Sequence, residues 1–237
     1  FTLGGKPYTG YPSFSAPDSY PEYVASCGVD VFLTANNHIL DKGAAGIKRT
    51  IAQYDRMEEQ KKIRYTGIAS DTNDYKSRYP LLLECKGFKI AIVNFTYGTN
   101  QGISSLFPKV NRIDKPEIAS AIRQARKKGA DFIIATPHWG TEYHLEHSAY
   151  QEAIAKWLVS QGVDMIIGSH PHVVQDTAIL THKGKEIPVI YSLGNAISNM
   201  SAPDTRLELA INIKMVRDHH GDKKMLSPKI VFLWCTM

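Results

Sequence analysis

The feature that most constrains the fold of this chain is one order of segments that occurs three times. Each time a helix-like stretch ends at a glycine, and a short apolar run that opens on Val-Asp or Ala-Asp comes next. The three glycines are Gly28, Gly129 and Gly162, and polar residues follow each apolar run. Short apolar runs rich in β-branched residues are typical of strands buried on both faces. Helices that alternate with such strands predict a layered α/β architecture.

Helix and strand signals cover most of the sequence. Helices are expected at four stretches with helical spacing or helix-end signals: residues 21–27, 43–60, 116–128 and 148–161. Strands are expected at six apolar or alternating runs: residues 29–34, 63–67, 131–136, 163–168, 186–193 and 207–213. A hairpin is expected at residues 78–85 and 88–96, and the Gly- and Pro-rich residues up to Pro21 are expected to form a loop. With no internal repeat or low-complexity linker, one domain over residues 1–237 is the favoured organisation.

The charges of the chain are mild and scattered. Charged residues make up 22% of the sequence and the formal net charge is +5. The two basic clusters, Lys61-Lys62 and residues 123–128, each end a helix-like stretch, where cations favour the negative end of the helix dipole. We interpret both as solvated helix ends, with an anion-binding surface as the alternative. Nucleic acid is not an expected partner, because such proteins more often carry a continuous basic stripe.

Several other classes of protein lack support in the sequence. Three widely spaced cysteines argue against a disulfide framework, and the apolar neighbours of Cys27 and Cys85 predict buried thiols. No apolar run approaches the ~18 residues expected of a membrane span. The sequence also contains no GxSxG elbow, P-loop or GxGxxG motif, so a serine- or cysteine-nucleophile enzyme is not supported.

Residues with metal-binding or amide side chains directly follow the apolar runs. They are Asn37, His38, His138, His170, His172 and Asn195. In open α/β sheets, ligands bind beyond the carboxyl ends of the strands, so these side chains converge if the strands share a direction. Imidazole and carboxamide groups suit Zn, Fe, Ni or Mn. The sequence therefore predicts a histidine-rich divalent-metal site centred on Ser169-His170-Pro171-His172.

Each of these residues also has a structural interpretation. A lone histidine after a strand, such as His138, is often a hydrogen-bonded loop residue. Asn36 and Asn37 could serve a turn or the N-cap of the next helix. The remaining histidines lack a strand-end position and are expected on the solvated surface: His144, His147, His182, His219 and His220.

Four motifs in order give the chain a specific resemblance to a known family. They are Ala35-Asn36-Asn37-His38-(x)2-Asp41-(x)-Gly43, His138-Trp139-Gly140-Thr141-Glu142-Tyr143, residues 168–175 (GSHPHVVQ) and Tyr191-Ser192-Leu193-Gly194-Asn195. In these motifs, from about Pro12 to beyond Asn195, the chain resembles the CapA-type capsule and poly-γ-glutamate biosynthesis proteins. These belong to the calcineurin-like metallophosphatase superfamily. The resemblance implies a layered fold of central mixed sheets flanked by helices.

The resemblance also implies roles for individual residues. His38 would act as a general acid or contact the substrate oxyanion, and Asp41 would orient it. The metal ligands would be Asn37, His138, His170 and His172. The groups expected to bind substrate or to support these ligands are Asn36, Trp139, Glu142 and Asn195.

The family pattern contains two further motifs, a Gly-Asp strand end and an Asn-x-Glu segment, that would lie upstream of Phe1. We therefore expect the chain to be truncated at its N-terminus, to lack the first strand and to leave a sheet edge open. One or two divalent ions (Mn, Zn or Fe) are implied, two only in a full-length chain that supplies the upstream carboxylates. The chain as given is expected to bind metal weakly or to keep a single ion.

Two functions from different classes follow from the resemblance. The first is a metal-dependent, phosphoesterase-like hydrolase that acts on an anionic polymer or a phosphoester. The alternative is a non-catalytic accessory subunit that binds the polymer during envelope polymer synthesis or export, with membrane-bound partners. A metal-free α/β binding domain is a third possibility. The resemblance implies an extracytoplasmic, cell-envelope location, with an anchor upstream of Phe1.

Overall fold

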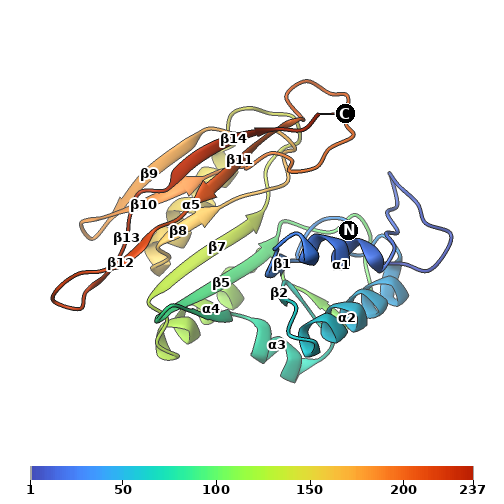
Figure 1. Cartoon of the computed structure of the whole chain (residues 1–237), viewed down its shortest axis with the longest axis horizontal. Coiled ribbons are helices and arrows are strands. Elements are labelled where there is room, and N and C mark those ends of the chain that lie inside the picture. Colours follow the sequence, from blue (N-terminus) through green and yellow to red (C-terminus); the bar gives the residue numbers. More distant parts are fainter. Residues whose placement is uncertain (1, 237) are drawn as a thin grey trace. The chain divides into compact units, whose positions relative to one another are not determined.

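The structure, a computed structural model, describes residues 2–236 and divides into two compact units (Figure 1). Unit 1 comprises the chain up to Leu81 together with Val93–Ile118. Unit 2 comprises Leu82–Ile92 and the chain from Ala119 onward. The single-domain organisation expected over residues 1–237 stays a prediction.

Unit 1 is built on a parallel pair of short strands joined by a helix. Strand β1 (Val31–Leu33) pairs in parallel with β2 (Arg64–Thr66), and α2 (Gly43–Glu59) connects them. Parallel strands need a crossover of this kind, which is why the helical stretch lies between the two apolar runs. The buried face of α2 includes Ile51 and Tyr54, and the Tyr54 ring stacks on Tyr65 of β2 at 5.3 Å between centroids.

The remaining elements of unit 1 are short. Helix α1 (Ser19–Ser26) precedes β1, and α3 (Thr72–Arg78) follows β3 (Ile68–Ala69), which pairs with β6 (Lys109–Val110). The sequence signals did not predict α3, because this helix has no buried residue and hence no apolar stripe. Its N-terminus is fixed instead by the Asp71 side chain, which accepts hydrogen bonds from the first-turn amides of Asn73 and Asp74.

The largest sheet has six strands in the order β4–β5–β7–β8–β10–β9. Their bounds are β4 (Leu81–Cys85), β5 (Phe88–Thr96), β7 (Phe132–His138), β8 (Met165–Ile167), β9 (Thr177–His182) and β10 (Lys185–Ile190). Strands β7, β8 and β10, all in unit 2, run parallel, whereas β9 is antiparallel to β10. Helices α4 (Lys115–Lys127) and α5 (Ala149–Gln161) alternate with the strands. The predicted mixed α/β class is confirmed.

The end of the chain forms two antiparallel pairs within unit 2. Strand β11 (Leu207–Asn212) pairs with β14 (Lys229–Trp234), and β12 (Met215–Arg217) pairs with β13 (Lys223–Met225). All six residues of β14 are exposed, although five of them are apolar. Among residues 2–236, no helix has the length and apolar content needed to cross a membrane.

The expectation of two buried thiols is wrong. Cys27 is the residue after α1, and Cys85 is the last residue of β4 before a two-residue turn, and both are exposed. Apolar neighbours along the sequence do not decide which way a side chain points at the end of an element.

Candidate functional site

The ends of three parallel strands hold a histidine group in unit 2. His138 is the last residue of β7, and its backbone forms a parallel bridge with Ser169, which follows β8. The amide of Gly168 donates to the carbonyl of Ile190, the last residue of β10. The expected convergence of side chains at one carboxyl edge therefore occurs among β7, β8 and β10.

The three imidazoles of this histidine group (His138, His170 and His172) lie close together around one carboxylate. The ring centroid of His170 is 4.7 Å from that of His138 and 6.1 Å from that of His172. Glu142 faces the rings of His170 and His172. Its Oε1 atom lies 4.0 Å from Nε2 of His170 and 3.9 Å from Nε2 of His172. His170 is 7% exposed, whereas the Glu142 side chain is 40% exposed, so the group opens to solvent on the Glu142 side.

The backbone that carries two of these imidazoles is strained. His170 has φ of 109° and His172 has φ of 64°, values that side chains with a Cβ rarely adopt. Such conformations cost of order 1–3 kcal/mol each and persist where the surrounding structure enforces them, often at functional sites. One enforcing contact is the hydrogen bond from the Tyr143 amide to the Pro171 carbonyl, 2.8 Å long, which pins the residue between them.

Asn195 fixes the proton position on His172. The Asn195 Nδ2 atom donates to the carbonyls of His172 and Thr205, at 3.1 and 3.0 Å, so its Oδ1 atom is the acceptor that lies 3.0 Å from His172 Nδ1. In neutral His172 the proton is therefore on Nδ1, and the lone pair is on Nε2, which faces Glu142. A metal-binding imidazole is commonly oriented in this way.

Trp139 is fully buried next to the histidine group. Its indole Nε1 donates to the Tyr191 carbonyl at 3.0 Å, and its amide donates to the Ser169 carbonyl at 2.9 Å. It thus ties the ends of β7, β8 and β10 together. Trp139 has no exposed surface, and its role, in substrate binding or in support of the ligands, stays a prediction.

A second group, in unit 1, consists of His38 and the residues that hold it. The Asp41 carboxylate Oδ2 lies 2.7 Å from His38 Nδ1 and also accepts from the Phe14 amide at 2.9 Å. The Phe14 ring packs edge-on against the His38 ring with centroids 4.7 Å apart. Asn100 Nδ2 is 3.3 Å from His38 Nδ1, but this nitrogen cannot accept from Asn100 while it donates to the closer Asp41.

The two asparagines before His38 have different places. The Asn36 Oδ1 atom accepts a hydrogen bond from the His38 amide, two residues on, at 2.9 Å. Asparagine side chains commonly form this hydrogen bond in turns. Asn37 is 5% exposed, and its carbonyl and side-chain nitrogen both hydrogen-bond Asn100. The predicted ligand role of Asn37 rests on its Oδ1 atom, which this contact to Asn100 does not use.

The structure thus gathers the predicted residues into two groups, each within its own unit. Unit 1 holds Asn36, Asn37, His38 and Asp41, and unit 2 holds His138, Trp139, Glu142, His170, His172 and Asn195. Strand β1 belongs to a two-stranded sheet apart from β7, β8 and β10, so a shared sheet edge does not join the groups. That both groups serve one site stays a prediction.

The histidine group fits a divalent cation in the kind of donors but not in their number. Imidazole nitrogen and carboxylate oxygen suit Zn, Mn or Fe, and two Nε2 atoms face the same carboxylate oxygen. However, no three His, Cys, Asp or Glu side chains within residues 2–236 are gathered at metal-binding geometry. That the group holds a divalent metal stays a prediction.

The sequence did not predict the pairing of His147 with Asp176. His147, expected on the solvated surface, lies 2.7 Å from Asp176 through its Nδ1 atom and stacks flat on Tyr191, with centroids 3.8 Å apart. Burial, and to a smaller extent the nearby Glu152 and Asp176 carboxylates, raises the pKa of the Tyr191 phenol to about 12. Asn100, beside His38, was also missed, because nothing local in the sequence marks a partner 62 residues away.

Comparisons with known protein families and relatives agree with the motifs. The family of bacterial capsule synthesis proteins PGA_cap matches residues 1–200. The chain is 30% identical over 188 residues to the capsule biosynthesis protein CapA of Bacillus anthracis, covering 77% of this chain and 43% of that protein. It is also 30% identical over 193 residues to the PGA biosynthesis protein CapA of Bacillus subtilis, covering 81% and 48%. The chain thus spans less than half the length of these relatives.

Solved structures support the fold. The NAD nucleotidase NadN of Haemophilus influenzae matches 91% of this chain and 38% of its own, with a TM-score of 0.54 at 12% identity. The sulfate thiohydrolase SoxB of Thermus thermophilus matches 90% of this chain and 34% of its own, with a TM-score of 0.55 at 14% identity. At such identities the likeness concerns the fold alone, and it agrees with the predicted layered α/β fold.

Proposed function

The chain belongs to the bacterial capsule synthesis protein family PGA_cap, and from this premise we propose that it is a metal-dependent, phosphoesterase-like hydrolase in the synthesis of an anionic capsule polymer. Its substrate is the polymer or a phosphoester that arises during its assembly. Because a capsule is part of the cell envelope, the proposal includes action at the envelope, alongside membrane-bound synthesis or export partners.

One observation carries the catalytic part of the proposal: Glu142 Oε1 lies within 4.0 Å of Nε2 of both His170 and His172. Two strained histidines that turn their Nε2 atoms toward one solvent-accessible carboxylate oxygen suit ligand binding better than structural support. We assign His170 and His172 as holding one divalent ion (Mn, Zn or Fe), with His138 and Asn37 as the further predicted ligands. When bound, such an ion supplies Lewis-acid chemistry to an anionic centre.

The residues of this chain have separable tasks in the proposed reaction. Asn195 keeps the His172 lone pair on Nε2, because its Oδ1 atom accepts a hydrogen bond from Nδ1–H. His38, with its Nδ1 held by Asp41, has its Nε2 atom available to hold or release a proton, which is the general-acid role. Glu142, 40% exposed, is the group that a substrate would meet at the mouth of the histidine group.

The proposal is tested by metal content and phosphodiester hydrolysis of the full-length protein incubated with Mn or Zn. Substituting both His170→Ala and His172→Ala should lower the bound metal and abolish hydrolysis of bis(p-nitrophenyl) phosphate. The matched control is His219→Ala with His220→Ala, which removes two exposed imidazoles from the turn between β12 and β13 and should change neither reading. Unchanged metal content in the first double variant would refute the metal site.

A second candidate function is a non-catalytic accessory role in polymer synthesis. It is favoured by the absence of three gathered metal-binding side chains within residues 2–236. A relative that is 25% identical over 197 residues is named a probable polyglutamine synthesis accessory protein in Mycobacterium tuberculosis. Full-length protein that binds the acidic polymer, yet neither retains metal nor hydrolyses the phosphodiester, would establish this role instead.

A further inference from the structure

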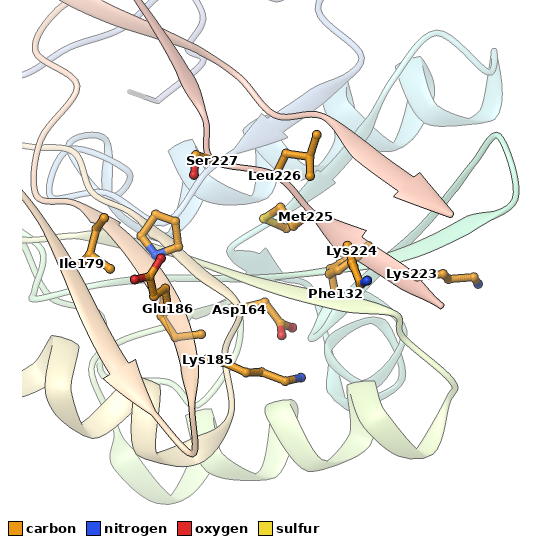
Figure 2. Close-up of a pocket in the computed structure, with 12 residues that line it drawn as sticks. Phe132, Asp164, Ile179, Lys185, Glu186, Lys223, Lys224, Met225, Leu226 and Ser227 are labelled. Carbon is orange, nitrogen blue, oxygen red and sulfur yellow. The ribbon is translucent and has the colours of Figure 1, made fainter. Parts of the chain in front are cut away.

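Two adjoining hollows of unit 2 lie at the end of the sheet away from the histidine group. The larger has a volume of about 310 Å³ and the smaller about 220 Å³, and Asp164, Lys185 and Ile187 line both. Because three residues line both, the two hollows adjoin one another and are taken together as one groove. Its lining includes Phe132, the first residue of β7, and Lys185, the first residue of β10 (Figure 2). The histidine group instead lies at the carboxyl ends of the strands. We call it the amino-end groove.

Cations outnumber carboxylates along the amino-end groove. The cationic side chains that line it are Arg126, Lys183, Lys185, Lys223 and Lys224, and the carboxylates are Asp164 and Glu186. Asp164 is already neutralised, because its Oδ2 atom accepts from Arg126 Nη2 at 2.6 Å and from the Ile133 amide at 2.8 Å. The groove is therefore poor in free negative charge.

The lysines of the groove differ in whether they form ion pairs. Lys223 and Lys224 pair with Asp131 and Asp218, at 2.6 and 2.9 Å, and so fix strand β13 as one wall of the groove. Lys183 and Lys185, at the tight turn between β9 and β10, form no side-chain hydrogen bond or ion pair with the part of the chain that the structure describes. Their ammonium groups are thus available to a ligand, and Lys185 stands where the two hollows meet.

Apolar side chains also line the larger hollow. Ile187 and Pro188 of β10 line the larger hollow. Met225 and Leu226 line it from the β13 side (Figure 2). A ligand that matches this lining alternates single negative charges with short methylene segments. A chain of γ-linked glutamate residues has this chemistry, since each repeat carries one carboxylate and two backbone methylenes.

We infer that the amino-end groove is a binding site for an acidic polycarboxylate chain, separate from the histidine group, with Lys183 and Lys185 as its recognition residues. This inference rests on the proposed function for the polymer as ligand, but not on hydrolysis. Lysine ammonium groups act as point charges and suit spaced carboxylates, whereas Arg126, the only guanidinium of the groove lining, is committed to Asp164. The groove has two aromatic rings in its lining, Phe132 and the imidazole of His182, whereas single-stranded nucleic acid binding would favour a longer series of stacking rings.

The test measures binding of fluorescent poly-γ-glutamate to the full-length protein by anisotropy. Lys183→Gln with Lys185→Gln should weaken binding about five- to tenfold, since two exposed charge contacts are lost. Raising NaCl from about 50 mM to about 300 mM should weaken wild-type binding and shrink the difference between the proteins. The matched control, Lys48→Gln with Lys62→Gln, makes the same change of charge at two exposed lysines of unit 1 and should bind as wild type.

Separate readings distinguish this inference from the proposed hydrolase. Hydrolysis of bis(p-nitrophenyl) phosphate should be equal in wild type and in the Lys183→Gln, Lys185→Gln protein, while the His170→Ala, His172→Ala protein should still bind the polymer. Equal loss of binding in the groove and control variants would overturn the inference, since it would show that net charge alone attracts the polymer. Tighter binding of single-stranded DNA than of poly-γ-glutamate would overturn it as well.

Discussion

The Nδ1 atom of His38 lies 2.7 Å from the Oδ2 atom of Asp41, three residues along the chain. The Asp41 side chain is 1% exposed and that of His38 is 17% exposed, so the carboxylate is sealed behind the ring while one edge of the ring reaches solvent. Because the carboxylate can only accept, the Nδ1 proton is fixed and Nε2 is the nitrogen that can exchange a proton with a ligand.

The first prediction concerns this pair. His38→Ala should lower the turnover of a phosphodiester by about 10²–10⁴-fold, the usual contribution of a positioned acid, without changing the metal content. Asp41→Asn should also lower turnover, because an amide can donate through Nδ2 as well as accept through Oδ1, so it no longer enforces a proton on His38 Nδ1. Turnover and metal content measured on the same preparations provide the check. Loss of metal from the His38→Ala protein would reassign His38 as a ligand.

The second prediction concerns Asn195, which accepts a hydrogen bond from Nδ1–H of His172. Asn195→Ala should weaken metal binding by about 10- to 100-fold, as loss of a group that orients a ligand histidine commonly does. Titration with Zn or Mn, followed by calorimetry, measures the change. Asn212→Ala, at the exposed end of β11, is the matched control and should bind as wild type. Equal affinity in the Asn195→Ala protein would mean that His172 is not a ligand.

Long periodic segments made most of the fold predictable. The helix expected at residues 43–60 is α2 (Gly43–Glu59), and the strand expected at 131–136 overlaps β7 (Phe132–His138). Elements without an apolar signal were missed. Helix α3 buries no residue, and strand β13 (Lys223–Met225) opens on two lysines. In such segments the partner strand or a single capping side chain decides the structure, and neither gives an apolar pattern in the sequence.

The candidate site was predictable to a similar extent. The strand-end position of His138 and His170 follows from apolar runs that end at known residues, and their rings are indeed neighbours. The pairing of His147 with Asp176 was not predictable, because the two residues are 29 positions apart and neither directly follows a strand expected from the sequence. Hydrogen-bond partners across a fold depend on register and loop path, which short-range patterns do not encode.

The third prediction concerns Gly168, the residue after β8, which lies close to Tyr191 and Trp139. A Cβ atom here would overlap the Tyr191 carbonyl oxygen and the indole nitrogen of Trp139. Gly168→Ala should therefore lower the free energy of unfolding by about 1–3 kcal/mol, the usual cost of overpacking, and displace the adjoining histidines. Chemical denaturation provides the measurement. Gly102→Ala, at a position with no atom within 4 Å of an added Cβ, should leave stability nearly unchanged.

The fourth prediction concerns Asp131, which ties the β12–β13 pair to the start of β7. Burial alone would raise the pKa of the Asp131 carboxyl, but its hydrogen bonds to Lys223 Nζ and the Lys89 amide, with the charge of Arg217, lower it below its ordinary value. A carboxyl whose pKa is lowered on folding stabilises the fold above its unfolded pKa of about 3.9, and this contribution is lost as the pH falls through the folded pKa.

Asp131→Asn should therefore lower the melting temperature at pH 7 by about 2–4 °C, the shift that corresponds to ~1 kcal/mol in a chain of this size. Toward pH 2 the gap between the variant and wild type should close, since wild-type Asp131 is then protonated as well. Thermal unfolding followed by circular dichroism at both pH values measures this gap. Asp222→Asn, which removes an exposed carboxylate in the turn between β12 and β13, should not reproduce it. A gap of the same size at both pH values would show that the Lys223–Asp131 ion pair does not stabilise the fold.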